Sequence, residues 1–529
     1  MKEVTVEAEN GHGGAYSSAG SRGVVRRGGG DDCGGSYQVM EDKPSKFEVM
    51  GWYVYELCSY FIQTVLIPLV FPLIISQLQH LPSNPDPVQD WHFHHPGLTC
   101  PDKEIHLYRK LTQRTISVSG SHFSSLEWTS IAWASGLAMA APILGFVSYH
   151  LDRNLHPIIA AAATGVGALF CLPAGFFKIT KIFIPYIAGI VAASTVAGAA
   201  HNHHLGLMVH AFTGPFLTKP QYRIRQAISH RLSLYSAAIG SVGAAIISAF
   251  TYHMLDEPNE HEFISLWIVS IFSGLLWLVG VLHVYTSSNR AASSLPPPSK
   301  FHPFSILKYP HAIGGLAGVF LSSFTTMCIF IGGVIFIVGQ QCIKPLHLLF
   351  LWLTYFLFPL LSLPLLQPFQ HLIRIDAVRM QILGFLLSIF SSGFGFFYND
   401  NPWKWGYLLI FGAIQGTSAG VLHASGRILV MECAPAGKEG AFAIWLSWLR
   451  AAGLCAGLTV GSVVPARRIR TSFGSAFCGA LVGILGLLFS KVSDVGGAVA
   501  AGHVIAEESE RGSNAASGLD SKEREGSRV

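Results

Sequence analysis

Apolar spans fill this chain between residues 51 and 490 and restrict its fold more than any other feature. A helix needs about 20 apolar residues to cross roughly 30 Å of hydrocarbon, and repeated runs of this length are typical of membrane proteins. We assign the spans to residues 51–78, 127–149, 156–177, 181–200, 229–253, 263–285, 311–339, 345–366, 376–397, 405–431, 439–464 and 472–490. The sequence therefore predicts an all-α polytopic membrane protein with about twelve transmembrane helices.

Composition argues against other classes of protein. Of the 529 residues, 50% are hydrophobic and 12% are charged, whereas soluble domains carry roughly 25% charged residues. The net charge is only +5, and Lys and Arg form no long run, so we expect no nucleic-acid partner. The chain has no phosphate-binding loop of the G-x-x-x-x-G-K-[ST] form, so we expect a gradient rather than ATP as any driving force. We also expect no cofactor.

A polar, proline-rich break at residues 286–309 follows the sixth span. Two packed bundles of six helices are a common architecture of secondary transporters, so the break predicts a linker between two bundles. The chain ends are polar, and we expect them to be disordered because they have little apolar surface to bury. The predicted organisation is a tail at 1–46, a bundle at 47–285 with a long loop at 79–126, the linker at 286–309, a bundle at 310–490 and a tail at 491–529.

An even number of spans places both tails on one side of the membrane. Lys and Arg are divided almost evenly between the two sets of loops, but the first tail adds several, and positive charge favours the cytosolic side. We therefore predict that both tails are cytosolic. The cluster of Arg467, Arg468 and Arg470 lies on the opposite side and argues against this orientation.

One acidic residue lies inside the first span. Ionisable side chains at membrane depth are costly, so each is a candidate for function. Glu56 is about one turn into the span, and Tyr60 and Gln63 follow at i+4 and i+7 on the same helical face. We predict that the three side chains share a substrate or coupling site.

Two arginines lie inside the second half. Arg427 is late in the tenth span, with His423 one turn before it, and Arg450 is near the middle of the eleventh. One interpretation places Glu56 and both arginines around a central cavity, where a cation holds a substrate carboxylate and an acid carries or senses a proton. The other pairs Glu56 with one arginine as a structural or gating ion pair, or lets it reach an interface. The position of Arg427 near the end of its span favours a structural role for that residue.

The histidines suggest a metal site, because neutral imidazoles suit zinc, copper or iron. They cluster at His92, His94 and His95, and at His201, His203, His204 and His210. Near these clusters the sequence shows no Cys or carboxylate that completes a recognisable site, so we expect polar or interfacial histidines and no metal ligands. A di-iron oxidase would need several separated histidine clusters, so we expect no enzyme.

The segment that leaves the second span resembles the loop 2–3 motif of the major facilitator superfamily. Gly145, Asp152 and Arg153 match in Pro142–Arg153, while the Gly-Arg that follows in the motif is absent. In that superfamily the segment is a cytosolic hinge between helices. The resemblance implies a major facilitator fold and a gate role for Asp152 and Arg153.

Two further segments resemble the autophagy-related vacuolar amino-acid effluxer family. Residues 51–56 read Gly-Trp-Tyr-Val-Tyr-Glu, where the family has Asp in the last position. Arg427 is followed by Pro-Ala-Gly-Lys-Glu-Gly-Ala-Phe at 435–442, where Ala441 replaces an acid. A basic residue is also common in the family at the position of Arg450. With these substitutions, the resemblance implies a divergent branch of that family.

This resemblance implies a secondary transporter that exports neutral amino acids across the vacuolar membrane to the cytosol. The implied partners are an amino acid, protons as the coupling ion and the lipid bilayer. Lys438 and Glu439 would join the cytosolic gate. Two alternatives remain open, namely a metal-cation transporter that uses the histidines and a membrane receptor or scaffold that transports nothing. The expected substrate or coupling site comprises Glu56, Tyr60, Gln63, His423, Arg427 and Arg450.

Overall fold

The structure is a computed structural model, and it describes most of the chain between residues 43 and 504. The described ranges are 43–79, 108, 110–176, 179–214, 217–256, 262–286, 303–339, 345–373, 375–398, 403–435, 437–463, 469–490 and 492–504. Within them, 12 helices are long and apolar enough to cross a membrane. The histidines at 92–95 and most of the predicted loop at 79–126 lie outside the described residues.

The first half supplies six of these spans. The first span is α1 (Lys46–Phe61), which continues through the π-helical segment η1 (Ile62–Val70) into α2 (Phe71–Gln77). A short hairpin, β1 (Ile116–Val118) and β2 (Ser121–Phe123), precedes the second span. The remaining elements are α5 (Ser125–His150), η2 (Leu151–Leu155), α6 (His156–Cys171), η3 (Leu172–Gly175), η4 (Thr180–Ile182), α7 (Phe183–Thr213), α8 (Lys219–Asp256), α9 (Glu262–Val279), η5 (Gly280–Leu282) and α10 (His283–Thr286).

The second half begins with a short 3-10 helix, η6 (Pro303–Lys308), and supplies the other six spans. These are α11 (Pro310–Gly339), α12 (Pro345–Ile373), α13 (Ala377–Phe397), α14 (Trp405–Met431), α15 (Glu439–Val463) and α16 (Ile469–Phe489). A short helix, α17 (Asp494–Ala500), follows them. We call the end of the bundle at which α1 begins and α16 ends the tail side, and the other end the far side.

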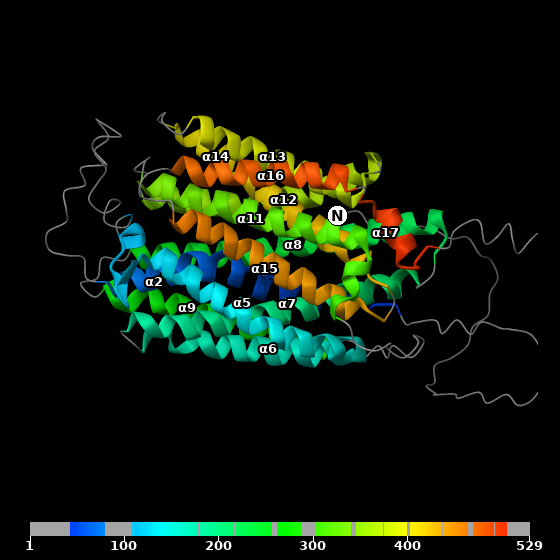
Figure 1. Cartoon of the computed structure of the whole chain (residues 1–529), viewed down its shortest axis with the longest axis horizontal. Coiled ribbons are helices and arrows are strands. Elements are labelled where there is room, and N and C mark those ends of the chain that lie inside the picture. Colours follow the sequence, from blue (N-terminus) through cyan, green and yellow to red (C-terminus); the bar gives the residue numbers. More distant parts are fainter. Residues whose placement is uncertain are drawn as a thin grey trace, which may run out of the picture. The chain divides into compact units, whose positions relative to one another are not determined.

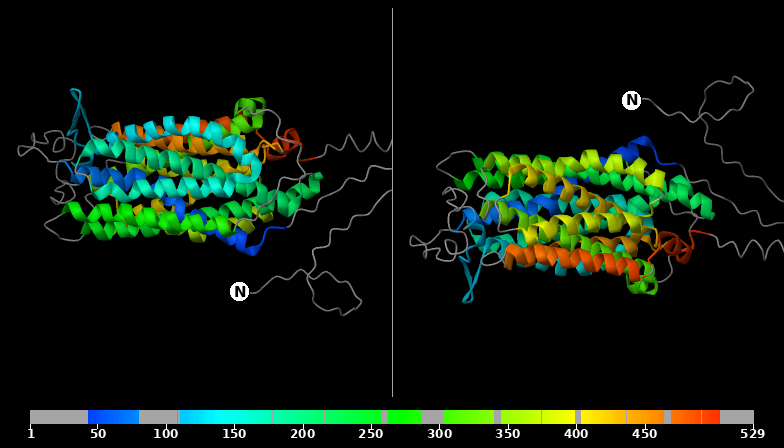
Figure 2. Two further views of the ribbon diagram at one scale, coloured as in Figure 1. Left: turned by 90° about the horizontal axis from the view of Figure 1, so that it is seen from below. Right: turned by 90° about the horizontal axis from the view of Figure 1, so that it is seen from above.

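Helices of the two halves pack against one another along the bundle (Figure 1). In the first half α5 and α6 pack on α7, and α1 packs on α8; in the second half α11 packs on α15 and α16. Across the halves, α15 packs on α5 and α7, and α8 packs on α12 and α14. Two further views show the same helices lying alongside one another (Figure 2). These cross-half contacts position the central site.

Pro68 lies inside η1 and accounts for the wider turns of that segment. Proline lacks an N–H group and its ring crowds the carbonyl four residues earlier, so the helix ladder must adjust around it. π-helical turns are frequent at functional sites. Here the segment begins at Ile62, directly before Gln63. Its wider turns change the direction of Gln63 and the side chains after it relative to Glu56 and Tyr60.

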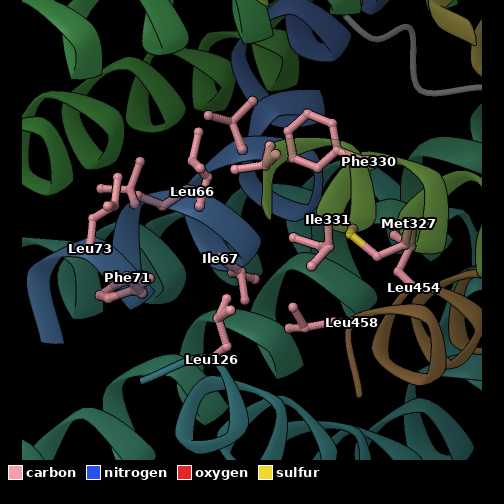
Figure 3. Close-up of a cluster of buried hydrophobic side chains, with 14 of the residues drawn as sticks. Leu66, Ile67, Phe71, Leu73, Leu126, Met327, Phe330, Ile331, Leu454 and Leu458 are labelled. Carbon is pink, nitrogen blue, oxygen red and sulfur yellow. The ribbon is translucent and has the colours of Figure 1, made fainter. Parts of the chain in front are cut away.

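A large apolar cluster joins the halves on the far side (Figure 3). Many of its members come from η1, α2 and α5 in the first half and from α11 and α15 in the second, and they include Leu66, Ile67, Phe71, Leu73, Leu126, Met327, Phe330, Ile331, Leu454 and Leu458. Lipid is as apolar as these side chains, so close van der Waals packing rather than transfer from water stabilises the contact between the helices. The cluster therefore seals the far side of the central site.

Large apolar side chains also lie on the outside of the bundle. Phe146 is 71% exposed and Phe489 is 80% exposed. Extensive exposed apolar surface is unfavourable in water and favourable in lipid. The outer faces are therefore suited to the bilayer, as expected for a protein with so few charged residues.

Three boundaries predicted from the sequence are wrong. The fourth span does not end at residue 200, because α7 continues through the polar run 201–204 to Thr213. The fifth span begins at Lys219 rather than at 229. The disordered tail was predicted to begin at 491, but residues 494–500 form α17, which docks on the bundle through the buried Asp494. In each case buried polar partners from distant segments allow the helix to form.

Candidate functional site

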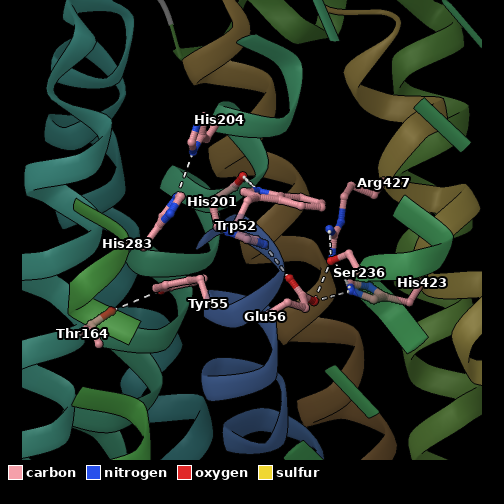
Figure 4. Close-up of polar contacts among 10 residues, drawn as sticks. All are labelled: Trp52, Tyr55, Glu56, Thr164, His201, His204, Ser236, His283, His423 and Arg427. Atoms are coloured by element: carbon pink, nitrogen blue, oxygen red, sulfur yellow. Dashed lines mark hydrogen bonds and ion pairs between the residues drawn. The ribbon is translucent and has the colours of Figure 1, made fainter. Parts of the chain in front are cut away.

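Glu56 of α1 is the centre of a buried charge network between the two halves (Figure 4). Its Oε1 accepts a hydrogen bond from Nη2 of Arg427 at 3.0 Å and lies 3.2 Å from Nε2 of His423. Its Oε2 lies 2.6 Å from Nε2 of His201. The carboxylate thus contacts α7 of its own half and α14 of the other half.

The close approach of α1 to α8 brings Glu56 to this position. A Cβ atom at Gly240 of α8 would lie 3.0 Å from Cγ of Glu56, and one at Gly243 would lie 2.0 Å from the carbonyl oxygen of Leu57. Only residues without a side chain allow two helix backbones to lie this close. The two glycines therefore fix how deeply α1 sits in the bundle.

Arg427 is 2% exposed and reaches both halves. Besides Glu56, its Nη1 donates to Oγ of Ser236 on α8 at 3.3 Å. Its guanidinium carbon lies 5.6 Å from the ring of Trp52, which stacks on His201 with ring centroids 4.6 Å apart. A cation over an indole face adds about 0.5–2 kcal/mol of attraction. Nε of Arg427 has no hydrogen-bond partner among the described residues.

Two adjoining cavities lie beside this network, and they share four lining residues, Tyr60, Asn202, Arg427 and Arg450. The first cavity is also lined by Glu56, Gln63 and His201, and the second by His423, Ser322 and Ser323. The structure therefore brings all six residues of the predicted substrate or coupling site to one place. They come from helices of both halves.

Arg450 of α15 faces both cavities, and its guanidinium carbon lies 5.6 Å from the ring of Tyr60. Among the described residues, no carboxylate lies within 4.0 Å of it. The ion-pair partner of Glu56 is therefore Arg427 and not Arg450. Gln63 lies deeper in the first cavity and donates from Nε2 to Oγ of Ser194 at 3.2 Å.

A second buried chain of polar groups lies next to Glu56 and was missed in the sequence. Glu48 Oε1 lies 2.9 Å from Nε2 of His204, whose Nδ1 lies 2.9 Å from Nε2 of His283. Nδ1 of His283 in turn lies 3.1 Å from Oγ1 of Thr286. Because α7 is continuous, His201 and His204 fall on one helical face at i and i+3, which is the signal that the sequence offered.

The predicted cytosolic gate residues lie on the tail side, but only two of them meet. Oδ1 of Asp152 accepts a hydrogen bond from the N–H of Gly440 at 2.8 Å, at the start of α15, where Glu439 lies beside it. Arg153 instead lies over the ring of Tyr149, with 4.1 Å between its guanidinium carbon and the ring centroid. Lys438 has no ion pair among the described residues; its backbone N–H bonds to Pro435 at 3.0 Å.

A second ion pair joins the halves on the tail side. Nε of Arg225 on α8 lies 2.8 Å from Oε2 of Glu432, which follows α14, and Oγ of Ser229 donates to Oε1 of Glu432 at 2.8 Å. Arg225 is 1% exposed. The fifth span predicted from the sequence begins at 229, so Arg225 lies outside it, whereas α8 begins at Lys219 and contains Arg225.

Asp494 holds α17 against both halves. Its Oδ2 accepts hydrogen bonds from the N–H of Ala377 at 2.7 Å and from Nε2 of Gln226 at 3.1 Å. Burial raises the pKa of Asp494 to about 7, although the hydrogen bond from Ala377 lowers that pKa in part. The helix α17 is therefore part of the tail-side closure.

Twelve described membrane spans in two bundles, with a charge network between them, define a polytopic membrane protein with the major facilitator fold. Among solved structures, the chain is similar to the human organic anion transporter MFSD10 (TETRAN), with a TM-score of 0.50 and 13% identity over 84% of this chain and 100% of that chain. This similarity confirms the fold class expected from the spans. No family model and no curated protein sequence matches the chain.

Proposed function

We propose that this protein is a secondary active transporter that moves a small carboxylate-bearing solute by alternating access. The observation that carries the proposal is Arg450, a cation without a carboxylate partner among the described residues, which faces the cavities between the halves. A guanidinium binds a carboxylate through two parallel hydrogen bonds, and this pairing is strong where water is scarce. The similarity to an organic anion transporter agrees with an anionic group on the solute.

Glu56 is the proposed coupling acid. Its negative charge holds Arg427 across the halves at 3.0 Å. Protonation would remove that charge, weaken the attraction and release the tail side. A solute or proton that binds one state more tightly than the other shifts the balance between the states. Proton movement through Glu56 would therefore couple a pH gradient to the opening of the bundle.

Neutral amino acids are the proposed solutes, exported across the vacuolar membrane to the cytosol. This part rests on the resemblance of residues 51–56 and 427–442 to the vacuolar effluxer family. An amino acid would place its carboxylate on Arg450. Its ammonium group would face the carbonyl oxygen of Gln63, whose amide nitrogen is already engaged by Ser194.

The test is a solute screen on the purified protein in liposomes, with and without an inward pH gradient. We expect flux of at least one carboxylate-bearing solute, a loss of at least tenfold in Arg450→Ala and partial recovery in Arg450→Lys. The matched control is Arg470→Ala on α16, because Arg470 is exposed and lies outside both cavities.

Three outcomes would contradict the proposal. Unchanged flux in Arg450→Ala would remove the assigned anchor. Uptake of a labelled metal ion that requires His201 and His204 would favour the metal-cation alternative. Absence of flux for every solute and ion in the folded protein would favour a receptor or scaffold.

A further inference from the structure

We propose that Asp152, His203 and Glu439 form a binding site for a divalent transition-metal ion such as Zn²⁺, which clamps the two halves together on the tail side. One ligand atom from each of the three residues lies within 4.8 Å of the other two. Two of the residues come from the first half and Glu439 comes from the second. The site therefore exists only where the two halves meet.

The distances suit a shared ion better than direct contact. Nε2 of His203 lies 3.8 Å from Oδ1 of Asp152, which is too long for a hydrogen bond. Ligand atoms lie about 2.0–2.2 Å from a zinc ion, so two ligands of one ion are up to roughly 4 Å apart. Side-chain movements of less than about 1 Å would bring all three atoms into that range.

The two carboxylates of the cluster favour a bound cation. Two carboxylates are brought together where Glu439 is 4% exposed and the Asp152 side chain is 12% exposed. Among the described residues, no Lys or Arg lies within ion-pair distance of either one. Their hydrogen bonds come from backbone N–H groups of Gly437 and Gly440. Burying like charges without a counter-ion is costly, and a divalent ion would offset both.

His203 points to a metal rather than to a simple counter-ion. The residue is 2% exposed, its Nδ1 has no hydrogen-bond partner among the described residues, and its Nε2 lies 3.8 Å from Oδ1 of Asp152. Coordination of an ion by Nε2 would replace this long contact with Asp152 by a direct ligand bond. One imidazole with two carboxylates is a donor set that zinc accepts, with water in the fourth position.

Such an ion would regulate the protein by holding one conformation. A ligand that binds only the closed tail side stabilises that state by an amount that grows with the ratio of its concentration to its Kd. Since Asp152 already caps the start of α15 through Gly440, the ion would reinforce an existing contact between η2 and α15. Zinc on the tail side would then inhibit movement of the halves; this consequence rests on the proposed function, whereas the binding does not.

The experiment measures Zn²⁺ binding to the purified full chain by calorimetric titration after treatment with a chelator. His92, His94 and His95 are replaced by Ala in every sample, so that this loop cluster does not contribute. We expect one high-affinity Zn²⁺ per chain and at least tenfold weaker binding in both His203→Gln and Glu439→Gln. The control is His347→Ala on α12, away from the site, which should bind Zn²⁺ as the background does.

The outcomes separate the metal site from transport. Glu439→Gln keeps the size and hydrogen-bonding oxygen of the side chain, so its melting temperature without zinc checks that the fold survives. Background-level affinity in both folded variants would overturn the metal site. Zinc binding that depends on the two residues, in a protein that moves no solute, would support the metal site and overturn the proposed transport function.

Discussion

Glu56 and Arg427 lie 371 residues apart in the sequence and form a buried ion pair with 3.0 Å between Oε1 and Nη2. The pair joins α1 of the first half to α14 of the second. His201 and His423 approach the same carboxylate, so one acidic side chain organises basic groups from both halves. A buried pair of this kind is costly to break from one side, because the remaining charge is left without a partner.

The pair should therefore show strong coupling in a double-mutant cycle. We expect Glu56→Gln and Arg427→Gln each to lower the free energy of unfolding by about 3–5 kcal/mol. The double variant should lose clearly less than the sum, because no charge is left alone. Denaturant titration of the four proteins in detergent measures this. Additive losses would show that the two side chains act independently.

The contact of α8 with α1 should not tolerate a methyl group at residue 243. A Cβ atom there would lie 2.0 Å from the carbonyl oxygen of Leu57, so the backbones must separate. We expect Gly243→Ala to destabilise the protein by about 1–3 kcal/mol or more. Gly333→Ala is the matched control, because its Cβ would meet no atom within 4 Å. Equal melting temperatures for the two variants would refute the close approach.

The docking of α17 should weaken as the pH rises from about 4 to about 7. Burial raises the pKa of Asp494 to about 7 from an ordinary value of 3.8, with Asp376 and Glu432 acting in the same direction. Below pH 4 the carboxyl is protonated both docked and undocked. Between the two pKa values only the undocked form ionises, so the docked form loses stability; above pH 7 the difference is constant.

Amide hydrogen exchange of residues 494–500 at pH 5 and pH 8, corrected for the intrinsic rate, measures this effect. Protection should be greater at pH 5. Asp494→Asn keeps an oxygen that can accept from Ala377 and cannot ionise, so its protection should hardly depend on pH. The same pH dependence in the Asn variant would assign the effect to another group.

The pair between Arg225 and Glu432 should hold the tail side closed. Cys433 directly follows Glu432 and is 1% exposed. Burial raises the pKa of its thiol to about 12. Reaction with a maleimide therefore requires opening. In a chain with Cys433 as its sole cysteine, we expect Glu432→Gln to accelerate labelling at least tenfold.

The control for this experiment is Arg379→Gln, which alters an exposed charge on α13 near the same end. It should label at the background rate. If Glu432→Gln also labelled at the background rate, the ion pair would not contribute to closure. A membrane-impermeant maleimide applied from either side would also test the predicted cytosolic location of the tails.

The spans could be predicted because the bilayer imposes a local rule. Every backbone group inside hydrocarbon must be bonded within its helix, so length and hydropathy identify a span without knowledge of its neighbours. The same rule failed at residues 201–204, where a run of polar residues suggested the end of the fourth span. His201 and His204 remain inside α7 because Glu56 and Glu48 lie beside them, and such partners are invisible in a local window.

By itself the sequence determined the spans, the two halves and the few ionisable side chains at membrane depth, since these follow from hydropathy and helical period. Only the tertiary structure decided which of them meet. It pairs Glu56 with Arg427 and leaves Arg450 to face the cavities, and it brings Asp152 and Glu439 to His203. Such choices depend on how α14 and α15 pack against the first half. Contacts between residues hundreds of positions apart are set by packing geometry, which no local pattern records.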